Sequence, residues 1–105
     1  MKSLHELVAD KLERAAPATR ATLLRIPLDN IDRWLANGHT APHRLEQWRQ
    51  IIQRAQQSPE GLQEMLTLLR DRSAATERVR DFAPFAGVLT ASERAVIIRQ
   101  CAYSH

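Results

Sequence analysis

Two pairs of residues have the spacing of metal ligands. His39 and His43 are four residues apart, and so are Cys101 and His105. A structural zinc site needs four ligands, usually cysteine and histidine, and neither pair has a third ligand close to it in the sequence. Cys101 is the only cysteine, so it can form no disulfide within the chain, and its simplest role is that of a small buried apolar residue. We therefore expect no metal and no cofactor.

The sequence contains no recognisable set of catalytic residues. The sequence contains no glycine-rich phosphate-binding loop, no serine or cysteine nucleophile with an evident base, and no carboxylate pair in an expected cleft. A single cysteine fits a reducing compartment, and no apolar run is long enough for a membrane span or a signal peptide. We expect a cytoplasmic protein that is not an enzyme and does not contact a membrane.

The distribution of charge indicates a polyanionic partner. Residues 1–57 hold nine basic and six acidic residues, whereas residues 58–105 hold six of each, so the whole excess of +3 lies in the first part. A chain of 105 residues buries one modest core. The expected organisation is a single compact domain, in which a DNA-binding-like region, 1–57, is followed by a helical extension, 58–105.

Helix start signals predict an all-α fold. The capping box Ser3 to Glu6 begins a helix over about 3–14, because its hydroxyl and carboxylate satisfy amides that have no partner at a helix start. Pro17 is placed to begin a second helix that runs to about Arg25. Ile26-Pro27-Leu28 then predicts a turn, since proline removes a hydrogen-bond donor and disfavours helix in the residue before it.

Further signals divide the rest of the chain into helices. Asp29 is expected to cap a third helix that ends at Asn37-Gly38, and Thr40 a fourth that has Pro42 in its first turn. The predicted buried stripe of this fourth helix includes Trp48, and Trp34 is also expected to face the core. Later helices are predicted from Ser58-Pro59-Glu60, over about Thr76 to Asp81, and from a second capping box, Thr90 to Glu93, into Val96, Ile97, Ile98 and Cys101.

The apolar residues between Pro17 and Asn37 have the spacing of two short helices packed across each other. This region resembles the lambda-repressor/Cro-like helix-turn-helix family, the xenobiotic-response-element type, and the resemblance covers about residues 3–56. Its strongest part is Ile31-Asp32-Arg33-Trp34, followed by Asn37-Gly38 and the amphipathic run Leu45 to Ile52. The resemblance implies a helix-turn-helix core in which the second helix enters the major groove.

By this resemblance the chain is expected to be a sequence-specific regulator that binds duplex DNA, with Arg33 reaching a guanine or a phosphate. The alternative is a module that keeps the fold but binds a protein partner instead, which the acidic residues Asp29 and Asp32 favour. Both acids are also well placed to cap a helix. The residues expected at the DNA interface are Arg20, Arg25, Leu28, Asp29, Asp32, Arg33, Asn37, His39 and Arg44.

An apolar segment near the C-terminus, 82–89, is broken by Pro84 and Gly87 and cannot form one regular helix. Either it closes the core of its own chain or it meets a second subunit. Two-fold regulators bind two half-sites, so we predict a symmetric homodimer. The residues expected at its interface are Phe82, Phe85, Val88 and Leu89.

Overall fold

Helices make up all the regular structure in the described part of the chain, residues 3–38 and 41–95 of a computed structural model, which confirms the all-α prediction. His39, Thr40 and the residues predicted to extend the last helix, 96–101, lie outside the described residues. In chain order the helices are α1 (Leu4–Arg14), α2 (Pro17–Ala36), α3 (Pro42–Gln57), α4 (Pro59–Arg70) and α5 (Ala74–Asp81), and a further helix begins at residue 91.

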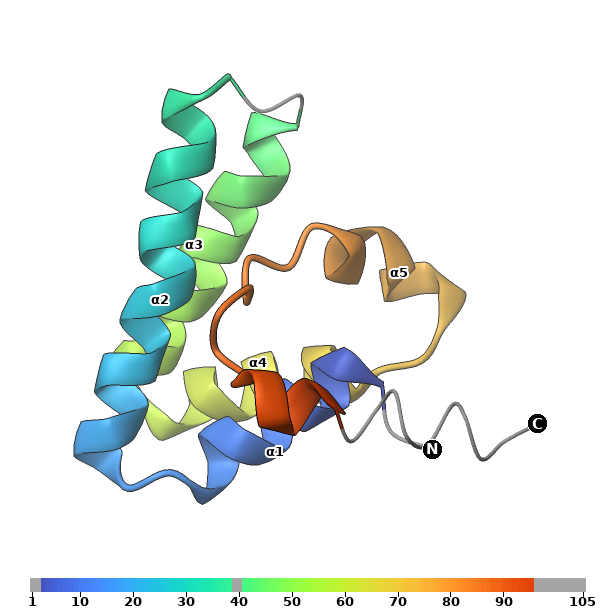
Figure 1. Ribbon diagram of the computed structural model, residues 1–105. Helices are drawn as coiled ribbons and strands as arrows, with labels where there is room; N and C mark the ends of the chain where they lie inside the picture. The colour runs from blue at the N-terminus through green and yellow to red at the C-terminus, as the bar shows by residue number, and fades with distance from the viewer. Residues whose placement is uncertain (1–2, 39–40, 96–105) are drawn as a thin grey trace.

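The two longest helices, α2 and α3, form an antiparallel hairpin (Figure 1). At one end of the hairpin α1 and α4 pack against it and against each other, while α5 and the segment after it lie along one side. A single core runs from α1 to residue 89, so the two predicted regions share one interior. Its most deeply buried side chains are Val8, Leu12, Leu24, Ile31, Leu45, Trp48, Ile52, Met65, Leu66, Leu69 and Val88.

Three of the predicted helix caps are present. The Ser3 hydroxyl oxygen accepts a hydrogen bond from the backbone amide of Glu6 at 3.2 Å, and the Ser58 hydroxyl oxygen accepts one from Gly61 at 3.0 Å. The second capping box is complete, because the Thr90 amide donates to the Glu93 carboxylate and the Glu93 amide donates to the Thr90 hydroxyl. Each cap satisfies amides that have no partner inside their helix.

The predicted turn at residues 26–28 is wrong. α2 is one continuous helix of 20 residues with Pro27 inside it, and Asp29 lies in its middle rather than at an N-cap. An interior proline costs about 3 kcal/mol. Leu24, Pro27 and Ile31 form one buried stripe, and each buried Leu or Ile gains about 1.5–3 kcal/mol. Packing therefore outweighs the local signal, and two short crossed helices do not form here.

The start of α4 packs very closely against the end of α3. A Cβ atom added at Gly61 would lie 2.1 Å from the backbone oxygen of Arg54, and backbone atoms cannot move aside as a flexible side chain can. The glycine therefore sets the tight corner between these two helices.

We expect Gly61→Ala to lower the free energy of unfolding by about 1–3 kcal/mol, because the new methyl group overpacks the corner. Urea denaturation followed by far-UV circular dichroism measures it. Gln63→Ala, at an exposed position of the same helix, is the control and should change stability by less than about 0.5 kcal/mol. Equal stability of the two variants would contradict this packing.

Candidate functional site

The face of α2 that points to solvent carries charges of both signs. Arg25, Asp29, Asp32 and Arg33 are all exposed and follow one another at helical spacing. Two bases and two acids nearly cancel, so this face produces little net field toward a polyanion.

Two of the arginines expected to contact DNA phosphates form hydrogen bonds within the chain. Arg20 donates to the backbone oxygens of Leu12 and Ala15 at 2.7 and 3.0 Å, and also to that of Glu13. These carbonyls at the end of α1 have no helical partner, so Arg20 caps the helix. Arg44 donates to the Gln47 side chain at 3.2 Å.

An ion pair crosses the hairpin from the same face of α2. Asp32 accepts from the Arg49 guanidinium on α3 at 2.7 Å, and Arg49 also contacts Glu46. The hydrogen bond to Asp32 is the main reason why the pKa of Arg49 is raised. Of the remaining predicted interface residues, Leu28 is half-buried against the core and Asn37 caps the end of α2.

Asn30, which was not among the predicted site residues, is the one buried polar residue in the part of the chain that the structure describes. Its side chain is buried on α2, with the residue only 3% exposed, and its amide nitrogen donates to the backbone oxygens of Pro84 and Ala86 at 2.9 and 2.8 Å. The guanidinium of Arg33 donates to the other end of the same amide, the Asn30 side-chain oxygen. Every hydrogen-bonding group of the Asn30 amide therefore has a partner. The available signal was an asparagine four residues, about one helical turn, from both Ile26 and Trp34.

Asn30 holds residues 82–89, the docked segment, against the helices. Between its two bonded carbonyls the ring of Phe85 inserts into the core and meets Trp48 edge-on, with ring centroids 5.4 Å apart. A turn follows, in which the Val88 amide donates to the Phe85 oxygen and Gly87 takes a positive φ of 90°. Only glycine adopts that φ without strain.

The residues predicted to form a dimer interface are buried in their own chain. Phe85, Val88 and Leu89 are 6%, 1% and 5% exposed, and Phe82 is half-buried against the same core. The docked segment thus follows the first of the two predicted alternatives, closing the core of its own chain. These side chains are therefore not exposed on the surface of the chain, where they could form the predicted dimer interface.

Lys11 of α1 holds the far end of the docked segment. Its ammonium donates to the backbone oxygen of Val88 at 2.7 Å and to the carboxylate of Glu93 at 2.7 Å. The hydrogen bond from Lys11 is the main reason why the pKa of Glu93 lies below its ordinary value. One carboxylate therefore joins the last described helix to both its own cap and α1.

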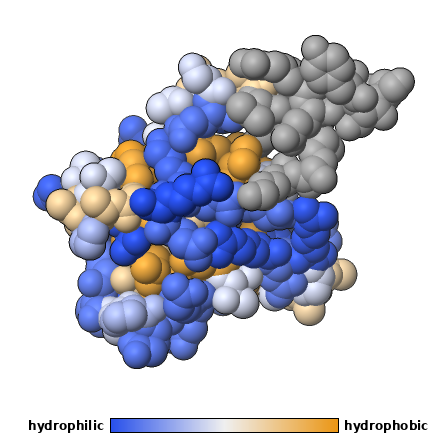
Figure 2. Space-filling view, turned by 90° about the horizontal axis from the view of Figure 1, so that it is seen from below, coloured by the Kyte–Doolittle hydropathy of each residue, from blue (hydrophilic) through white to orange (hydrophobic). Residues whose placement is uncertain are grey.

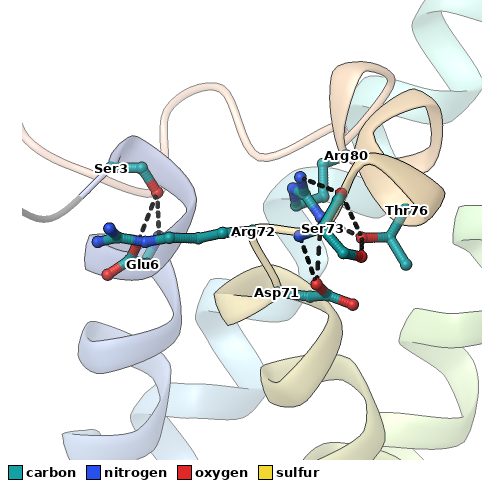
Figure 3. Close-up of polar contacts among 7 residues, drawn as sticks. All are labelled: Ser3, Glu6, Asp71, Arg72, Ser73, Thr76 and Arg80. Carbon is teal, nitrogen blue, oxygen red and sulfur yellow. Dashed lines mark hydrogen bonds and ion pairs between the residues drawn. The ribbon is translucent and has the colours of Figure 1, made fainter.

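A second polar network fixes the connection between α4 and α5 (Figure 3). Arg72 reaches across to α1, where its guanidinium contacts Glu6 at 2.6 Å and lowers the pKa of that carboxyl. On the other side, Arg80 donates to the Thr76 hydroxyl and to the Ser73 backbone oxygen. These bonds position an exposed connection.

Two cavities lie beside α1. The larger, of about 450 Å³, has an apolar floor that includes Leu7 and Leu23 and a rim that includes the Lys11–Glu93 pair. The smaller, of about 320 Å³, is lined by His5, Asp81 and Phe85 among others, and burial lowers the pKa of His5. Figure 2 views the molecule from this end, where hydrophilic side chains cross the face and apolar ones are visible between them.

Within residues 3–38 and 41–95, no group of three or more His, Cys, Asp or Glu side chains is placed to hold a metal ion. None of the helices in the same residues has the length and apolar character needed to cross a membrane. No family model, curated protein or solved structure matches the chain.

We expect Asn30→Leu to lower the free energy of unfolding by about 2–4 kcal/mol, since it leaves the oxygens of Pro84 and Ala86 without a donor. Thermal or urea unfolding followed by tryptophan fluorescence measures the loss. Asp29→Leu places the same side chain at the neighbouring exposed position and should cost less than about 0.5 kcal/mol. If the two leucine variants are equally stable, Asn30 does not hold the docked segment.

Proposed function

We propose that this chain is a helical protein-interaction module and not a reader of duplex DNA. The observation that carries the proposal is the exposed face of α2, where Asp29 and Asp32 lie between Arg25 and Arg33. A major-groove helix meets phosphates on both sides, and each carboxylate there is repelled. A surface of mixed sign instead favours a protein partner of complementary pattern, because opposite charges fix the register of an interface.

The continuity of α2 supports the same proposal. A helix-turn-helix reader inserts a short second helix whose first turn contacts base edges. The corresponding residues here, 29–36, are the second half of a long helix, so they present no free helix start. Arg33, the residue expected to reach a base, also has a structural role, because its guanidinium holds the amide of Asn30.

We therefore expect the protein not to bind duplex DNA at about 50 µM in low salt, a concentration that reveals ordinary non-specific binding. Fluorescence anisotropy with a labelled random duplex measures this. The double variant Asp29→Asn/Asp32→Asn is a matched control, because it leaves only basic charges on the α2 face and should bind weakly and in a salt-dependent way. Wild-type binding whose logarithm falls with that of salt at a slope of about −3 or steeper would refute the proposal.

A positive test uses a photoreactive amino acid at position 29 in the cells that express the chain. The proposal expects a discrete protein cross-link from this position that Arg25→Glu abolishes. The same group at position 63, which is exposed on α4, is the control. Identical products from positions 29 and 63 would mean that the α2 face has no specific protein partner.

A further inference from the structure

The solvent-facing stripe of α2 is symmetric about Pro27. Because α2 continues through this buried proline, positions on its two sides belong to one regular helix. At about 100° per residue, the positions two and nine residues before and after Pro27 all lie on the side opposite to it. These positions hold Arg25 and Asp29 near the middle and Ala18 and Ala36 toward the ends, and all four are exposed. The stripe therefore carries opposite charges at equal distances from its centre.

The two central charges of this stripe are not used within the chain. Asp32, farther along the same helix, is paired with Arg49 of α3. The side chains of Arg25 and Asp29, in contrast, form no hydrogen bond or ion pair in the part of the chain that the structure describes. α2 lies at the outer edge of the molecule, with its inner side packed on α3 (Figure 1). Both charges are therefore accessible to a second molecule.

A second copy of α2, laid antiparallel on the first, matches this symmetry. With a two-fold axis at the level of Pro27, a residue before the proline meets the residue equally far after it in the other copy. Arg25 then meets Asp29 of the other copy, and the axis generates this pair twice. Ala18 meets Ala36 at both ends, where small side chains let two helices approach closely. A parallel pair in register would instead place like charges together, which repel.

We propose that the α2 face is a contact between two copies of this chain, paired antiparallel about a two-fold axis beside Pro27. The inference rests on the proposed interaction function and names the partner as a second copy. Exposed ion pairs are screened by water and alanines bury little area, so the contact is weak, with a dissociation constant on the order of 100 µM. The apolar side chains of residues 82–89 stay in the core of each copy.

Sedimentation equilibrium of the purified full chain, from about 10 µM to about 1 mM in low salt, measures the self-association. Arg25→Asp and Asp29→Arg each place like charges across the axis, so each variant alone should associate at least about tenfold more weakly than wild type. An equimolar mixture of the two should associate about as tightly as wild type, because two acidic positions then face two basic ones. Arg78→Asp, at an exposed position of α5, makes the same charge change as Arg25→Asp and is the control that should leave the association unaltered.

A wild-type chain that stays a monomer at about 1 mM, or a mixture that associates no better than its two components, would overturn the proposal. Wild type alone gives a readout that needs no variant. Its association should weaken at least about threefold when salt rises from about 50 to about 500 mM, because salt screens exposed ion pairs, and an unchanged association would also overturn the proposal. A monomeric chain that still forms a cross-link from position 29 to a different protein would overturn this inference and leave the proposed function standing.

Discussion

The buried amide of Asn30 connects the two parts of the molecule. From the middle of α2 it bonds to two carbonyls that flank Phe85, and Arg33 bonds to its oxygen. A buried amide without partners costs several kcal/mol, so the amide and the two carbonyls satisfy one another or none of them is satisfied. This mutual dependence selects one position for the docked segment, which an apolar surface alone does not do.

The apolar contacts of the core then follow from that position. With Pro84 and Ala86 fixed, Phe85 meets Trp48 and completes a core that the four preceding helices leave open on one side. Trp48 has a polar role as well, since its ring nitrogen donates to the Val79 oxygen at 2.7 Å and so fixes the end of α5. Lys11 and Glu93 close the far end. Residues 79–93 are thus held by a few side-chain bonds, most of them to main-chain oxygens.

Local signals in the sequence predicted the starts of helices well, because a cap depends only on neighbouring residues. Ser3, Ser58 and the Thr90–Glu93 pair could be identified without knowledge of the fold. Pro27 could not be interpreted in this way. Its local effect favours a turn, but burial of Pro27 with Leu24 and Ile31 in the core offsets that cost, and this burial depends on residues far away in the sequence. The error at one proline produced the expected recognition helix.

The site was harder to predict than the fold for the same reason. The sequence singled out Arg33 as a contact to a base or a phosphate, which stays a prediction. In the structure the Arg33 guanidinium donates to the side chain of Asn30, three residues before it. The contact of Arg33 depends on Asn30, and the position of the Asn30 side chain depends on the docked segment, about 50 residues later in the sequence. The apolar character of that segment was evident from the sequence, and so were the two alternatives for what covers it.

The central claim is that Asn30 holds residues 84–86 through its side-chain amide. Nuclear magnetic resonance of the uniformly labelled protein observes the two side-chain amide protons of Asn30 directly. The account predicts that both protons exchange slowly with water and show nuclear Overhauser effects to residues 84–86. Rapid exchange of both protons, without contacts to these residues, would contradict it.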